Sequence, residues 1–167
     1  MMQQVTDRNT QVETQSWLKT QVVKVNKLSQ GINDTQEMAQ ALVSELAVIL
    51  NAGHVVFYLL EEAERETDNY LLLASYAYVQ RKKISNHFAP GEGLVGQCAL
   101  EKQNILLTDI PDDYIKITSG LGERTPLNII ALPILFEKKC LAVIEIASFK
   151  PFEVIHIDFL NQTAANL

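Results

Sequence analysis

Cysteine is scarce in this sequence, and its scarcity limits the chemistry that the chain can support. The 167 residues include two cysteines, Cys98 and Cys140. Their number and spacing match neither the disulfide framework of a secreted protein nor a zinc-binding motif. The pattern favours a reduced intracellular protein in which both cysteines are small core or turn residues.

Long apolar runs and large basic clusters are also missing. No run reaches the roughly 18 apolar residues that a membrane span needs, and the N-terminus lacks the pattern of a signal peptide. The formal net charge is -6, and the two basic clusters, at residues 81–83 and 138–139, are short. Nucleic acid and anionic membranes are therefore unfavourable partners. We expect a cytoplasmic chain without direct membrane contact, and membrane anchoring of a longer parent protein stays open.

Catalytic and metal-binding motifs are absent as well. The sequence has no Walker loop, no H-x-E with C-x-x-C, and no recognisable Ser-His-Asp arrangement. The acidic run at residues 61–69 lacks the glycine and the alternating acids of a calcium loop. We interpret this run as a solvated hairpin loop and predict neither catalytic residues nor a metal site.

What is present is the pattern of one α+β domain, with 47% apolar residues to build its core. Helices are predicted by 3.6-residue periodicity or by capping residues, and strands by β-branched and aromatic runs. Asp34 caps the second helix, and Glu37 stands three residues later in capping-box position. The predicted helices cover residues 11–30 and 34–50, with a third starting near 153, and the predicted strands cover residues 54–60, 70–79, 128–136 and 140–149.

The stretch at residues 91–111 organises the rest of the chain. It predicts a tight turn, a short helix across one face of the sheet, and a short strand. Residues 91–96 fit G-x-G-x-x-G, and acids follow about 20 residues later, as in a dinucleotide site. However, the motif follows a polar run that ends in Pro90, where such a site requires a buried parallel strand. The glycines are therefore predicted to serve a sharp turn.

The first helix carries an apolar seam at spacings of three and four. This seam predicts packing either on its own domain or on the same helix of a second chain. We favour a homodimer, because the helix lies outside the compact pattern that follows. The predicted dimer interface comprises Leu18, Val22, Val25 and Ser29.

Two other features point to a binding site. Loops over a rigid sheet often carry binding groups, and residues 109–121 mix carboxylates, a phenol and hydroxyls. Glu145 lies in an apolar strand on the same face as Val143 and Ala147, so it is a partly buried acid that needs a partner. A structural hydrogen bond is the simpler interpretation of Glu145, and a ligand contact is the alternative.

Together, the order of elements resembles a GAF domain of the type found in bacterial multidomain sensor histidine kinases. The resemblance covers roughly residues 34–167 and rests on the turn at 91–96, the segment at 106–111 and the paired strands that end at 147–149. It implies a PAS-related central antiparallel sheet of about five to six strands, with helices on both faces and long terminal helices. It also divides the chain into a tail and signalling helix, residues 1–33, and a sensory domain, residues 34–167.

The resemblance further implies a small-molecule pocket between the sheet and residues 91–121. The positions that we expect to face a ligand there are Tyr76, Tyr78, Leu94, Cys98, Thr108, Asp109, Tyr114, Ile117, Ser119 and Glu145.

The better-defined chemistries of the family do not carry over. Residues 148–150 and 156–157 replace the signature of cyclic-nucleotide-binding members, and neither cysteine precedes the His or Phe that is common at bilin attachment sites. The three histidines lack a haem motif, and the methionine-sulfoxide reductases use a larger cysteine set. The cofactor is therefore unknown.

We expect a non-catalytic sensory module of a two-component histidine kinase, whose catalytic domains lie outside this chain. It would bind an unidentified small molecule or partner and signal through its terminal helices in a dimer. The alternatives are a cysteine-dependent redox enzyme of the same fold and a ligand-free dimerisation spacer.

Overall fold

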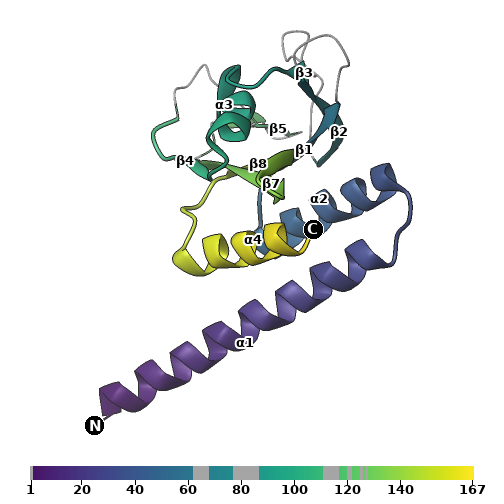
Figure 1. Cartoon of the computed structure of the whole chain (residues 1–167). Coiled ribbons are helices and arrows are strands. Elements are labelled where there is room, and N and C mark those ends of the chain that lie inside the picture. The colour runs from purple at the N-terminus through teal and green to yellow at the C-terminus, as the bar shows by residue number, and fades with distance from the viewer. Residues whose placement is uncertain are drawn as a thin grey trace.

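Figure 1 shows a computed structural model of the chain, which describes residues 2–61, 68–76, 87–110, 117–119, 122–124, 126 and 128–167. Its centre is a six-stranded sheet in which all neighbours are antiparallel. The strands, in spatial order, are β3 (His87–Phe88), β2 (Asn69–Tyr76), β1 (His54–Glu61), β8 (Lys139–Ser148), β7 (Asn128–Phe136) and β4 (Ile105–Leu107). A separate two-stranded hairpin joins β5 (Ile117–Ser119) and β6 (Gly122–Arg124). The expected α+β architecture is confirmed.

Helices cover both faces of the sheet. Three of them, α1 (Met2–Gln30), α2 (Thr35–Leu50) and α4 (Val154–Asn166), lie on one side, and α3 (Gly93–Glu101) lies on the other (Figure 1). Because side chains alternate along a strand, β1 supplies both cores. Val55 and Phe57 join the cluster beneath the three helices, whereas Val56 and Tyr58 join the cluster beneath α3.

Capping residues and turn residues form where the sequence predicts them. The side chain of Asp34 accepts a hydrogen bond of 2.9 Å from the backbone N–H of Glu37 and starts α2. The β7–β8 hairpin forms around the predicted turn, where Glu137 and Lys138 adopt positive φ. The ladder between these strands shifts register between Ile134 and Leu135. Pro133 itself pairs in register with Val143, and the shift leaves Leu141 of β8 as the extra residue.

The glycines at residues 91–96 build a turn. Gly91 and Gly93 have φ of 84° and 65°, which side chains disfavour. A Cβ atom at Gly96 would clash with the carbonyl oxygen of Ala89. The turn follows β3, a two-residue strand at the edge of an antiparallel sheet, so the setting of a dinucleotide-binding motif is missing.

The apolar seam of α1 is used inside the chain. The helix is longer than predicted, at 29 residues, and its Val25 is fully buried in the core cluster that α2 and α4 share. Leu18 and Val22 pack against the same cluster. Trp17 meets Phe159 of α4 edge to face, with ring centroids 5.8 Å apart. Val25 is thus buried by its own domain, whereas Leu18 and Val22 are only partly buried, and the dimer interface expected at these residues stays a prediction.

Ser29, the fourth residue of that predicted interface, is half-buried, and its hydroxyl donates a hydrogen bond to the carbonyl oxygen of Asn26 within α1. The expected loop at 61–69 and the polar segment at 109–121 lie largely outside the described residues. Within the second range, Ile117 begins β5.

Candidate functional site

The candidate site is the face of the sheet that α3 covers. Three registered positions on adjacent strands form its floor, because Glu145 of β8 pairs with Val56 of β1 on one side and with Ala131 of β7 on the other. Cross-strand partners point to the same face of a sheet. Val56 and Ala131 belong to the buried cluster beneath α3, so the carboxyl of Glu145 is on that face as well.

Glu145 is a half-buried acid in apolar surroundings. Burial raises the pKa of its carboxyl from 4.5 to about 7. Within the described part of the chain, this carboxyl has no hydrogen-bond or ion-pair partner. A carboxyl with a pKa near neutrality can accept a hydrogen bond when charged and donate one when protonated. It is therefore suited to a polar or cationic group placed against this face.

The two thiols lie in the buried cluster beneath α3. Cys98 of α3 is fully buried, and burial raises its pKa to about 12, with smaller contributions from the nearby Cys140, Glu101 and Glu145. Burial also raises the pKa of Cys140, although the ammonium of Lys102 and several hydrogen bonds act against the rise. Both thiols donate to backbone carbonyl oxygens, Cys98 to Gln103 at 3.4 Å and Cys140 to Ala142 at 3.2 Å. Both thiols are therefore buried and shifted away from the thiolate form.

Three aromatic residues, Tyr58, Tyr70 and Phe88, also belong to or pack against the cluster beneath α3. The hydroxyl of Tyr70 donates a hydrogen bond of 2.7 Å to the carbonyl oxygen of Cys140. Tyr58 meets Phe88 edge to face, with centroids 5.4 Å apart. These contacts link β1, β2, β3 and β8 beneath α3.

The structure brings together only some of the residues expected to face a ligand. Leu94 and Cys98 of α3 pack against the cluster that contains Val56 and Ala131, the two neighbours of Glu145. Thr108 and Asp109 are exposed beyond β4. The strand β5 contains Ile117 and Ser119, of which the structure describes only the backbone. Tyr78 and Tyr114 lie outside the described residues.

Tyr76, which we expected to face a ligand, lies instead on the face of the sheet that α2 covers. It pairs in register with Val55, a member of the core beneath α2, and it is 38% exposed at the end of β2. The ladder between β1 and β2 shifts register between Phe57 and Tyr58. This irregularity inserts an extra residue in β2 and reverses the facing of every residue after it.

The sequence-based list missed the tyrosines that frame the site. Tyr58 and Tyr70 lie in the predicted strands, and alternation with Val56 on one strand could have placed Tyr58 on this face. No sequence signal predicts the hydrogen bond from Tyr70, because it depends on the order of the strands in space.

Two broader properties of the described residues bear on the class of site. Within those ranges, no cluster of three or more His, Cys, Asp or Glu side chains could hold a metal ion. None of the described helices combines the length and apolarity required to cross a membrane.

Comparison with solved structures finds the same fold in proteins of low sequence identity. The GAF domain of a phosphoenolpyruvate-protein phosphotransferase from Coxiella burnetii matches with a TM-score of 0.71 and 19% identity, over 89% of this chain and 88% of that one. The free methionine-R-sulfoxide reductase from Neisseria meningitidis, in complex with its substrate, matches with a TM-score of 0.68 and 16% identity, over 89% and 84%. The fold is therefore shared by domains of larger proteins and by enzymes.

The sequence profile described as GAF domain matches residues 33–167, which is most of the chain. A search of curated protein sequences found no match to this chain. The profile match, the antiparallel six-stranded sheet and the helices on both faces agree, and the chain belongs to the GAF domain family.

Proposed function

We propose that this chain is a non-catalytic sensory module of a signalling protein, of the two-component histidine kinase type. It binds a small molecule on the sheet face beneath α3. The observation that carries this proposal is Glu145, a half-buried carboxyl without a partner among the described residues, on an otherwise apolar face. Leaving such a group unpaired costs free energy, which a ligand with a matching donor would recover.

The state of the thiols supports a non-catalytic role. A nucleophilic cysteine reacts as the thiolate, and reactive cysteines are exposed with lowered pKa. At pH 7, a thiol with a pKa of about 12 is ionised in roughly one molecule in 100,000. Cys98 and Cys140 are both buried with raised pKa, the reverse of what a cysteine-dependent reductase needs.

The position of Glu145 also supports transmission through the helices. Its strand neighbours Ile144 and Ile146 are fully buried on the other side of the sheet, in the core that contains Val25 of α1 and Phe159 of α4. A shift of β8 on ligand binding would be felt by the packing of α1 and α4, since well-packed cores transmit displacement. A homodimer would carry that change to the output domain of the parent protein.

The proposal is tested by native mass spectrometry of the chain purified from expressing cells. We expect a mass increment that is lost under denaturing conditions. The increment should fall strongly in Glu145→Gln and persist in Glu61→Gln, a substitution at an exposed acid on β1. Equal retention in both variants would place the ligand elsewhere, and a wild-type mass without any increment would favour the spacer hypothesis.

A redox enzyme is the competing hypothesis, and three solved reductases of this fold motivate it. Reduction of free methionine sulfoxide should be measured for the wild type, Cys98→Ser and Cys140→Ser. Activity that disappears in either variant would replace our proposal, whereas a wild type without activity agrees with it.

A further inference from the structure

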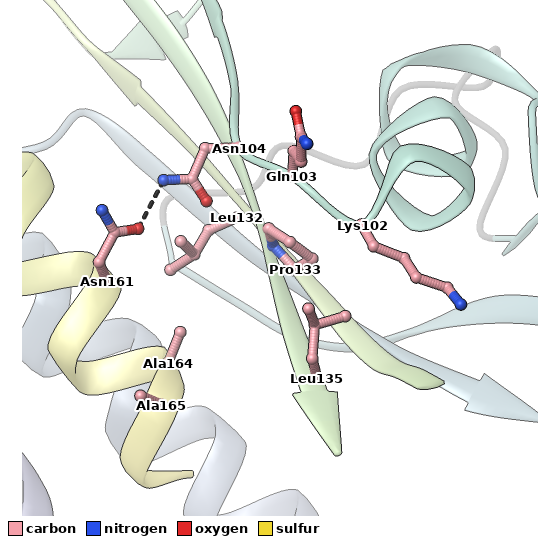
Figure 2. A pocket seen from close by; sticks show the side chains of 9 residues that line it. All are labelled: Lys102, Gln103, Asn104, Leu132, Pro133, Leu135, Asn161, Ala164 and Ala165. Carbon is pink, nitrogen blue, oxygen red and sulfur yellow. Dashed lines mark hydrogen bonds between the residues drawn. The ribbon is translucent and has the colours of Figure 1, made fainter. Parts of the chain in front are cut away.

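A hollow lies away from Glu145, on the side of β7 that faces away from β8. It has a volume of about 680 Å³ and opens between β7, the connection from α3 to β4, and α4 (Figure 2). Its walls thus come from three elements, one of which is the C-terminal helix. The lining residues that matter here are Lys102, Gln103, Asn104, Pro133, Leu135 and Ala165.

The hollow exists because the sheet splits at this point. Pairing of β4 with β7 ends at Ile105 and Ala131, and the connection at residues 102–104 then diverges from β7 (Figure 2). Pro133 follows on β7 and has no N–H to continue a ladder. Within the described residues, no strand pairs with residues 132–136 on that side. The result is a wedge with one backbone edge open.

The walls of the wedge combine apolar surface with carboxamides. Leu132 and Ala164 form its buried base, and Leu135 is 41% exposed at its mouth. At one end, the amide nitrogen of Asn104 donates a hydrogen bond of 2.6 Å to Oδ1 of Asn161, which ties the connection to α4. An open strand edge beside apolar pockets is the geometry that binds an extended peptide by adding a strand.

The other end of the wedge is positively charged. Among the described residues that line the wedge, Lys102 is the one that carries a charge. Its ammonium lowers the pKa of Cys140, which places the charge near the start of β8. Lys102 also lines an adjoining hollow of about 370 Å³, together with Lys138 and Lys139. Two acids, Asp68 and Glu137, also line this adjoining hollow, so its described lining residues sum to a net charge of +1.

We propose that this wedge is a second binding site, which takes an extended segment of a partner protein with a carboxylate at the end near Lys102. Backbone groups of the segment would pair with the open edge of β7, its side chains would rest on the exposed Leu135 and Ala165, and its carboxylate would meet Lys102. A second copy of this chain fits less well, because its own edge also carries Pro133 and cannot donate there.

Glu145 does not line the wedge, and the wedge touches α4 directly through Asn161 and Ala164. A bound segment would therefore contact the C-terminal helix whether or not a small molecule occupies the other face.

The test is a selection with a random 12-residue peptide library displayed on phage, against the wild-type chain. Counter-selection uses Ala165→Trp, which fills the wedge from an exposed position on α4, and Gln103→Trp, which fills it from the connection. The matched control is Gln162→Trp, at an exposed position of α4 that does not line the wedge. Circular dichroism establishes that each variant is folded.

We expect enriched peptides with an extended pattern and an acidic residue. In fluorescence anisotropy, they should bind the wild type and Gln162→Trp equally and lose binding to a folded wedge-filling variant. Lys102→Asn, which suits the left-handed backbone at this position, should weaken binding about threefold to tenfold. Absence of enrichment, or binding that survives in both filling variants, would overturn the proposal. So would a dimer by light scattering that Ala165→Trp abolishes, since the occupant would then be a second copy.

Discussion

Tyr70 of β2 reaches over β1 and donates a hydrogen bond of 2.7 Å to the backbone carbonyl oxygen of Cys140 in β8. The two strands are not neighbours, so this bond ties together a span of three strands at one end of the sheet. Tyr70 is 4% exposed and Cys140 is 3% exposed. The bond is therefore shielded from water on the same face that carries the candidate site.

We predict that Tyr70→Phe lowers the free energy of unfolding by about 1–2 kcal/mol, because it leaves a buried carbonyl oxygen without its donor. Urea unfolding measures the change. Tyr76→Phe is the matched control, since Tyr76 is 38% exposed at the end of the same strand and should cost less than about 0.5 kcal/mol. Equal effects of the two substitutions would contradict the assignment of the Tyr70 bond.

Gly96 should not tolerate a side chain. A Cβ atom there would meet the carbonyl oxygen of Ala89 and backbone atoms of Gly91 at 3.0 and 3.2 Å, none of which can rotate away. We predict that Gly96→Ala destabilises the fold by about 2 kcal/mol or more. Gly31→Ala is the comparison, because its nearest atom is the carbonyl oxygen of Lys27 at 3.3 Å. Similar unfolding midpoints for the two variants would argue against the tight turn.

The local elements of the fold could be predicted from the sequence, because each depends on nearby residues. Asp34 and Glu37 define the start of α2, and the turn at residues 137–139 defines the β7–β8 hairpin. The facing of Tyr76 could not be predicted. Strict alternation from Tyr70 places Tyr76 beneath α3, and only the irregular ladder near Phe57 turns it to the other side.

The apolar seam of α1 illustrates a second limit of periodicity. Its spacing identifies Val22 and Val25 as residues to bury, yet a helix of the same chain and a helix of another chain satisfy that requirement equally. The wedge beside β7 could not be predicted for a similar reason. Pro133 indicates a position that cannot donate to a ladder, but it does not reveal that Asn104 and Asn161 enclose a hollow there.

The thiols should resist modification in the folded chain. Cys98 is fully buried with a pKa of about 12, and Cys140 is 3% exposed. We predict that iodoacetamide at pH 7.5 labels neither cysteine within an hour and labels both after unfolding in guanidinium chloride. Mass spectrometry counts the adducts. Rapid labelling of Cys98 in the native protein would indicate a reactive thiol and strengthen the redox hypothesis.

The carboxyl of Glu145 should make stability depend on pH. Its pKa rises from 4.5 to about 7 on folding, so between these values the folded state binds more protons than the unfolded state. The contribution of Glu145 to stability is therefore fully present below about pH 4.5, and it is lost as the pH rises through about 7. The loss is about 1–3 kcal/mol.

Glu145→Gln removes this ionisation, and we predict that the variant is more stable than the wild type at pH 8, with a smaller difference at pH 5. Urea unfolding at pH 5, 6, 7 and 8 measures both chains, with Glu61→Gln as an exposed control. Parallel pH profiles for the wild type and Glu145→Gln would contradict the raised pKa. A ligand that co-purifies with the wild type must be removed first, because binding shifts the apparent stability.

Because Val25 is buried by its own domain, we predict that two chains pair through the outer face of α1. Val12 and Val23 are 64% and 43% exposed and stand eleven residues apart, about three turns, so they lie on the same side. We predict that the double variant Val12→Glu, Val23→Glu is monomeric by light scattering while its melting temperature stays close to that of the wild type. Val48→Glu, at a valine of α2 that is 70% exposed, is the control and should keep the dimer mass.

Val25→Glu distinguishes packing of α1 on its own domain from pairing of α1 with a second chain. Val25 is fully buried against the domain, and a charge there should cost about 3 kcal/mol or more and unfold part of the population. If Val25→Glu instead yielded a folded monomer, the seam would pair chains after all. If the double variant kept the mass of a dimer, the outer face of α1 would not be the interface.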